Sequence, residues 1–112
     1  MTKITGAQIE GLFNHAAGMT NGVLQVSKSF RYIINPNGEI KELKLNGKSI
    51  DKEKTYWVAS TNFVTLGGDG YWEFTESLEY EDTNIFIVDV VEEYLKDKPR
   101  YTPVYENRIV IE

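Results

Sequence analysis

A glycine-rich segment, Gly67–Gly70, lies between two aromatic residues, Phe63 and Tyr71. Its letters are Gly-Gly-Asp-Gly, so the backbone can bend sharply while Asp69 presents one carboxylate. An aromatic face supplies apolar contact area, and a carboxylate accepts hydrogen bonds from ring or sugar donors, which together suit a planar polar ligand. The same residue types also suit a structural turn over a core aromatic residue, and both interpretations stay open on the residues alone.

This segment does not have the pattern of a phosphate-binding loop. It lacks the Lys-Ser/Thr pair of a P-loop and the spacing of a dinucleotide-binding fingerprint. The carboxylate of Asp69 would also repel phosphate. We therefore expect any ligand of this segment to be bound through its planar or sugar part.

Residues for catalysis or metal binding are scarce in the sequence. His15 is the only histidine, and there is no cysteine. Hydrolytic metal sites usually gather several histidine and carboxylate ligands, and a serine nucleophile needs a context such as Gly-x-Ser-x-Gly, which is absent here. We interpret His15 as a partly buried or surface helix residue and the Glu92-Glu93 pair as part of a solvated face. The sequence predicts no catalytic residue, metal ligand or cofactor site in this chain.

The composition is that of an ordinary globular domain. The 112 residues include 12 basic and 17 acidic side chains, for a net charge of −5, and 41% of the residues are hydrophobic. One domain over residues 1–112 is expected at this length. The acidic balance argues against nucleic acid as a partner. We expect no membrane span and no signal peptide, because the sequence has neither a long apolar run nor an apolar segment behind its N-terminus.

Hydrophobic spacing and turn residues predict an α+β fold. Thr5 with Gln8 forms a capping box for a first helix that ends near Gly18. A second helix is predicted over 84–96 from its apolar spacing. Strands are predicted at Val23–Val26, Ser29–Ile34, Glu39–Leu45, Tyr56–Thr61 and Arg108–Ile111, with turns at Asn35–Gly38 and Asn46-Gly47. The expected architecture is a single domain in which a mixed sheet with hairpins packs against two main helices.

Several short motifs, in this order and spacing, resemble the C-terminal domain of the 5′-nucleotidase family. The most specific is Asn62-Phe63 followed, after three residues, by Gly-Gly-Asp-Gly-Tyr at 67–71. The other motifs are Ile-Thr-Gly-Ala-Gln-Ile at 4–9, Gly-Val-Leu-Gln-Val-Ser at 22–27, Asn-Gly-Lys at 46–48, the run from Tyr56 and Asn-Arg-Ile at 107–109. The resemblance covers nearly the whole chain.

The resemblance implies a nucleoside-binding domain of a phosphohydrolase. In that family an N-terminal metallophosphoesterase domain carries a pair of divalent metals and the catalytic residues, and the C-terminal domain recognises the nucleoside. By position, Phe63 is similar to a ring that stacks on the base, and Asp69 is similar to the carboxylate that binds the ribose. Asn62 and Gly68 would shape the loop around them. Family habit also implies an extracytoplasmic location.

Two departures from the family pattern limit what the resemblance implies. A second stacking ring stands just before Leu-Gln-Val in characterised relatives, and this sequence has Val23 there. The family domain also normally starts further upstream, so we expect this chain to hold part of that domain, without the metallophosphoesterase domain. If the chain is such a part, its first helix is expected to expose apolar surface and to cause weak self-association.

Two other functions remain open from the sequence. One is an interaction or structural module in which ligand binding has lapsed, as Val23 would permit. The other, an autonomous hydrolase, is less favoured, because the residues for hydrolysis are missing.

Overall fold

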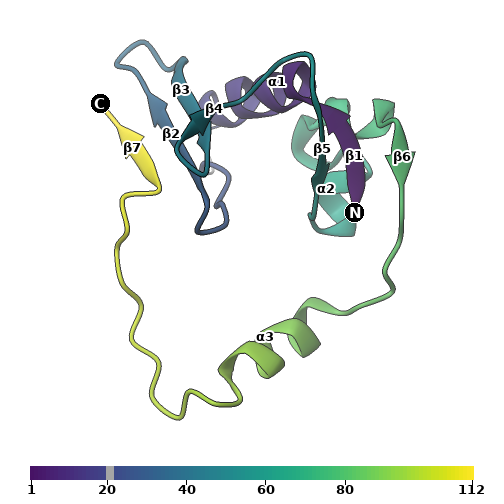
Figure 1. The fold of residues 1–112 in the computed structure, drawn as a ribbon, viewed down its shortest axis with the longest axis vertical. Coiled ribbons are helices and arrows are strands. Elements are labelled where there is room, and N and C mark those ends of the chain that lie inside the picture. Colours follow the sequence, from purple (N-terminus) through teal and green to yellow (C-terminus); the bar gives the residue numbers. More distant parts are fainter. Residues whose placement is uncertain (20–21) are drawn as a thin grey trace.

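Helix α1 (Gly6–Ala17) is the central element of the fold. The computed structural model describes residues 1–19 and 22–112. The helix begins with the predicted capping box, in which the Gln8 amide nitrogen donates to Thr5 Oγ1 (3.1 Å) and the Thr5 amide nitrogen donates to Gln8 Oε1 (2.8 Å). It ends at Gly18, as the sequence predicted. Figure 1 shows α1 running between the two groups of strands.

The strands of the described residues form two sheets, where the sequence predicted one. The first sheet has the order β5-β1-β6 and is antiparallel; its strands are β1 (Thr2–Thr5), β5 (Thr55–Val58) and β6 (Glu79–Tyr80). The second has the order β4-β3-β2-β7; its strands are β2 (Phe30–Ile34), β3 (Ile40–Leu45), β4 (Lys48–Ser49) and β7 (Ile109–Ile111). This second sheet is mixed, because β7 runs parallel to β2 while β2, β3 and β4 pair antiparallel. The α+β fold class is therefore confirmed.

The core forms where α1 packs against the second sheet and against the segment that follows β5. Phe13 stacks on Phe30 with ring centroids 4.9 Å apart and meets Tyr32 at 4.8 Å in a tilted contact. The buried apolar residues are Ile4, Ile9, Leu12, Phe13, Ala16, Tyr32, Ile34, Leu43, Tyr71 and Phe74. They come from α1, both sheets and the segment after β5, so one core joins the two sheets.

The predicted strand at Val23–Val26 is wrong. Residues 22–27 have no regular secondary structure. Two of their carbonyl groups are bound by side chains from other elements: the Tyr32 hydroxyl donates to Leu24 O at 2.7 Å, and Arg108 Nη1 donates to Val26 O at 2.9 Å. These side-chain contacts replace the backbone ladder that the β-branched residues favoured.

Two other element boundaries differ from the prediction. The strand expected at Tyr56–Thr61 is shorter: β5 ends at Val58, and Thr61 instead caps a short helix, α2 (Asn62–Thr65). Two 3₁₀ turns follow, η1 (Gly68–Gly70) and η2 (Trp72–Glu76). The sequence analysis also missed β1, which lies at the centre of the first sheet with Thr2 and Ile4 fully buried.

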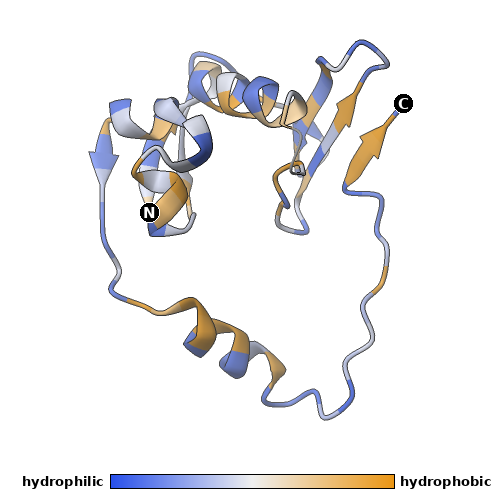
Figure 2. Cartoon of the chain, turned by 180° about the vertical axis from the view of Figure 1, so that it is seen from behind, coloured by the Kyte–Doolittle hydropathy of each residue, from blue (hydrophilic) through white to orange (hydrophobic). Residues whose placement is uncertain are grey.

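Helix α3 (Ile87–Leu95) stands apart from the rest of the fold. Every residue from 78 to 105 is exposed, so the expectation that two helices pack on a sheet holds for α1 alone. Figure 2 shows apolar residues along α3, and Figure 1 shows the helix away from both sheets. The apolar surface was expected on the first helix; it is found on α3 instead, at Ile87, Val90, Val91, Tyr94 and Leu95. No helix of the described residues is long and apolar enough to cross a membrane.

Core and α3 substitutions should therefore differ sharply in their effect on stability. Leu12, at 2% exposure, lies in the core, and Leu12→Ala should lower the free energy of unfolding by about 2–5 kcal/mol through lost contacts and a cavity. Val91 is 48% exposed, and Val91→Ala should change it by no more than about 0.5 kcal/mol. Urea denaturation of both variants measures the difference. If Val91→Ala lowered the free energy of unfolding as much as Leu12→Ala does, α3 would have to be packed against the protein in solution.

Tyr32 should make the protein sensitive to alkaline pH. Burial, and secondarily the charge of Tyr71, raises the pKa of Tyr32 to about 12 from an ordinary value of 10.0. Below pH 10 the hydroxyl is protonated in both states, and the stability is fully present. Between pH 10 and 12 only the unfolded chain loses this proton, so the free energy of unfolding falls as pH rises, by up to about 2–3 kcal/mol.

Tyr32→Phe lacks this titration, although it also removes the donor to Leu24 O. Its free energy of unfolding should fall less between pH 10 and 12 than that of the unmodified protein, since the other groups titrate equally in both. Urea denaturation at several pH values checks this difference. If the free energy of unfolding fell equally with pH in both proteins, the raised pKa of Tyr32 would be contradicted.

Candidate functional site

The loop between β5 and η2 carries the residues that the sequence singled out. Thr61 caps α2 by accepting a hydrogen bond from the Val64 amide, 3.4 Å from its Oγ1, and the Asn62 side-chain oxygen accepts one from the Phe63 amide at 3.0 Å. Within this one turn of helix, Thr65 faces the core and Phe63 faces outward, with 59% of its surface exposed. The short helix thus presents an aromatic ring to solvent.

Gly68 allows the loop to pass directly against Phe63. A Cβ atom at position 68 would lie 2.5 Å from the Phe63 carbonyl oxygen and 2.7 Å from its ring carbons. Any larger residue would therefore displace the ring or the loop. The structure therefore places Gly68, at the start of η1, directly against Phe63 of α2, next to Asn62.

Asp69 follows in a left-handed conformation, with φ 56° and ψ 19°. Its side chain is exposed, while its backbone carbonyl oxygen lies 2.5 Å from His15 Nε2 on α1. Asp69 also lines a hollow of about 170 Å³. The other residues that line it are Met19, Gly22, Val23, Leu24, Val64 and Tyr71; Phe63 lies outside this set.

The hollow brings Val23 to the same site as Asp69. The loop that carries Val23 is held by the Tyr32 hydroxyl and the Arg108 guanidinium described above. Arg108 is itself paired with Glu106, whose carboxylate accepts from Nε at 3.1 Å. The hydrogen bond from Arg108, helped by the charges of Arg108, Lys28 and Arg31, lowers the pKa of the Glu106 carboxyl below its ordinary value.

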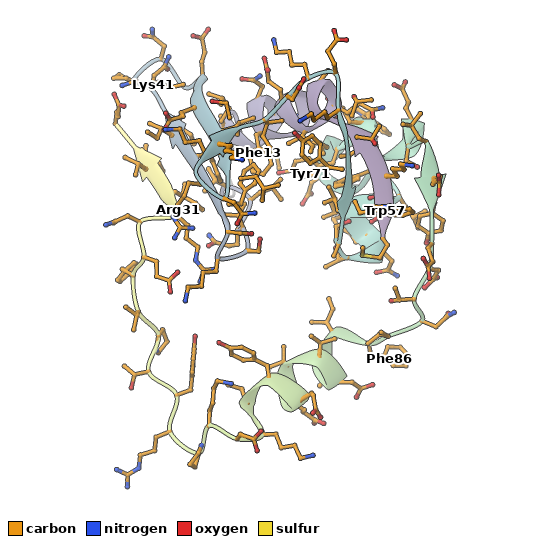
Figure 3. All side chains as sticks on the ribbon, in the orientation of Figure 1. Phe13, Arg31, Lys41, Trp57, Tyr71 and Phe86 are labelled. Atoms are coloured by element: carbon orange, nitrogen blue, oxygen red, sulfur yellow. The ribbon has the colours of Figure 1, made fainter. Side chains whose placement is uncertain are left out.

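Tyr71 is the core residue beneath this site. It is almost fully buried and meets the His15 imidazole edge-on, with ring centroids 4.9 Å apart. Figure 3 shows its side chain below α1, between the two sheets. Burial, and secondarily the charge of Asp69, raises the pKa of Tyr71. The segment 67–70 therefore is a turn over a core aromatic residue, and the same turn leaves Phe63 and Asp69 open to solvent.

The described residues offer no metal centre. Within 1–19 and 22–112, no group of three or more His, Cys, Asp or Glu side chains is placed to hold a metal ion. The ring of His15 lies against the turn of Asp69 and Tyr71. The sequence analysis missed this role of His15, and also the roles of Tyr32 and Arg108 in holding the loop of Val23. Contacts between residues so far apart in the chain leave no local pattern.

The chain is similar to known proteins across this site and beyond it. Residues 1–76 match the family model described as 5′-nucleotidase, C-terminal domain. Protein UshA of Escherichia coli (strain K12) is 35% identical over 71 residues, which cover 62% of this chain and 13% of UshA. The trifunctional nucleotide phosphoesterase protein YfkN of Bacillus subtilis (strain 168) is 33% identical over 119 residues, which cover 95% of this chain and 8% of YfkN. The chain thus spans a small fraction of the length of these relatives.

A solved structure extends the similarity to the whole fold. The 5′-nucleotidase precursor from Thermus thermophilus superposes with a TM-score of 0.85 at 27% sequence identity, covering 98% of this chain and 24% of that one. The superposition includes α3 and β7, which lie beyond the residues matched by the family model. With two thirds of its residues matched by that model, the chain belongs to the family of 5′-nucleotidase C-terminal domains.

Proposed function

We propose that this chain binds the nucleoside part of a nucleotide for a 5′-nucleotidase-type phosphohydrolase. In this proposal Phe63 stacks on the base and Asp69 accepts hydrogen bonds from the ribose. A separate metallophosphoesterase domain with two divalent metals hydrolyses the phosphate, and the chain itself supplies no catalytic residue. An extracytoplasmic setting, implied by the family resemblance, belongs to the same proposal.

The observation that carries the proposal is the segment from α2 to the turn at 67–70, which leaves Phe63 and Asp69 both exposed to solvent. An exposed ring braced by the backbone at Gly68 gains apolar contact when a base covers it, without first having to be ordered. Asp69, six residues further on, is also exposed, and a carboxylate accepts hydrogen bonds from hydroxyl donors. Asn62 and Gly68 support the site by fixing the turn.

Charge favours binding through the nucleoside end. The chain has a net charge of −5, and Asp69 adds a carboxylate at the site itself. Both repel phosphate, so the phosphate is expected to point away from this chain. Divalent metals on another domain would supply the positive charge that it needs.

Val23 stands at the position where the family resemblance implies a second stacking ring. It lies on the hollow that Asp69 also lines, where an aliphatic side chain offers packing but no ring stacking. We therefore expect base binding that depends mainly on Phe63. Val23→Phe adds a ring to the hollow beside Asp69, and we expect it to tighten adenosine binding by about fivefold or more, in line with about 1–3 kcal/mol for base stacking elsewhere. Unchanged affinity would show that position 23 does not face the base.

The proposal is tested by titrating the chain with adenosine, uridine and their monophosphates while following amide shifts at 63 and 68–70. Saturable shifts of similar affinity with and without phosphate are expected. Phe63→Ala should weaken binding about tenfold or more, whereas Tyr105→Ala, which removes a fully exposed aromatic residue elsewhere, should have no effect. Unchanged affinity in Phe63→Ala would contradict base stacking. No shifts at millimolar ligand would favour a module without ligand binding.

Asp69→Asn tests the ribose contact separately. Asparagine tolerates the left-handed backbone of position 69 but lacks the charge of the carboxylate. The variant should bind adenosine several-fold more weakly, because hydrogen bonds to a charged acceptor are the stronger ones. Its affinity for adenine, which has no ribose, should stay unchanged. An equal loss for adenosine and adenine would contradict a role in ribose binding.

A further inference from the structure

His15 connects α1 to the turn that carries Asp69. Its Nε2 atom lies 2.5 Å from the Asp69 carbonyl oxygen, across 54 residues of sequence. A carbonyl oxygen can only accept a hydrogen bond, so Nε2 must carry the proton and donate it. This holds for the neutral ring protonated at Nε2 and for the cation alike.

The imidazole also limits how the turn can move. It meets Tyr71 edge-on at 4.9 Å, and a Cβ atom at Gly70 would lie 2.9 Å from its Cε1 and Nε2 atoms. The ring therefore lies against the backbone of Gly70 and against the side chain of the next residue. Three consecutive residues, 69 to 71, contact this one side chain.

The backbone of Asp69 needs such support. Its φ of 56° is uncommon for a residue other than glycine, and Gly70 follows with a φ of 82°. Two consecutive left-handed residues set the direction in which the Asp69 side chain leaves the turn. A hydrogen bond to the carbonyl between them stabilises that conformation over the alternatives.

We propose that His15 is a positioning residue that holds Asp69 in the conformation in which its carboxylate meets the ligand. The inference rests on the proposed function for the role of Asp69 in binding the ligand. The contact between His15 and the turn can be tested without any ligand.

Two variants distinguish the hydrogen bond donated by His15 from the packing of its ring. His15→Gln keeps an N–H donor near the position of Nε2, while His15→Phe keeps an aromatic ring against Tyr71 and Gly70 but has no donor. Because both substitutions change the ring next to Gly70, the readout in the ligand-free chain is the three-bond coupling between the amide and Hα protons of Asp69, which reports its φ. His15→Phe should change this coupling, and His15→Gln should keep it. In titrations, His15→Phe should weaken adenosine binding about tenfold and leave adenine binding unchanged, with His15→Gln within about threefold of the unmodified chain.

Two results would overturn the proposal. One is an unchanged amide-to-Hα coupling of Asp69 in His15→Phe together with unchanged adenosine affinity. The other is an equal loss in both variants that follows their melting temperatures, which indicates a structural role alone. Nitrogen spectra of the His15 ring in the unmodified chain give a third test that needs no variant: a neutral ring protonated at Nδ1 alone could not donate from Nε2 and would contradict it.

The same set of experiments keeps this proposal distinct from the proposed function. If the unmodified chain binds neither adenosine nor adenine, nucleoside binding by this chain is refuted. The ligand-free spectra and the ring nitrogen signals still decide whether His15 positions Asp69.

Discussion

The burial of one face of α1 is the interaction on which the rest of the structure depends. Leu12, Phe13 and Ala16 pack into a core that takes residues from both sheets and from the loop after β5. The first sheet is too small to form a core of its own, since its strands have only two to four residues. Because α1 contacts the second sheet on one side and η2 on the other, it sets where the two halves lie relative to each other.

Side chains from helix α1, strand β2 and the start of β7 hold the candidate site in place. They do so by donating hydrogen bonds to backbone carbonyl groups of the loops. His15 on α1 binds the carbonyl of Asp69, Tyr32 on β2 binds that of Leu24, and Arg108 beside β7 binds that of Val26. Each contact replaces a backbone hydrogen bond that an irregular segment lacks. The loop of Val23 and the turn of Asp69 are therefore fixed to elements that pack in the core, although neither segment belongs to a sheet. Such support suits a binding site, where precise placement reduces the cost of ordering on binding.

Local features of the fold were predictable from the sequence, and distant pairings were not. The capping box of α1 and the β2–β3 hairpin depend on residues close in the chain, and both were predicted correctly. Strand β1 has only four residues, which form a weak local pattern, and it pairs with β5 and β6, whose residues are fifty or more positions away in the chain. At Val23–Val26 the β-branched residues misled the prediction, since Tyr32 and Arg108 bind the carbonyl groups that a strand would use.

The same division applies to the site. The spacing from Phe63 to Asp69 indicates a single turn, because both lie within seven residues of chain. Val23 and Asp69 line the same hollow, and His15 contacts the turn. Both arrangements depend on how α1 and β2 pack, and no pattern in the sequence encodes that packing directly.

The attachment of β7 has a consequence for the loop that carries Val23. The strand returns to β2 after the long exposed segment that contains α3, so its pairing must offset the entropy of closing a large loop. Arg108, just before β7, is also the donor to Val26 O in the loop of Val23. Detachment of β7 would therefore withdraw one of the two side-chain donors that hold this loop and leave Tyr32 as the other. The placement of the loop of Val23 and the attachment of β7 are therefore linked through one side chain, so a change that stabilises either of them favours the other.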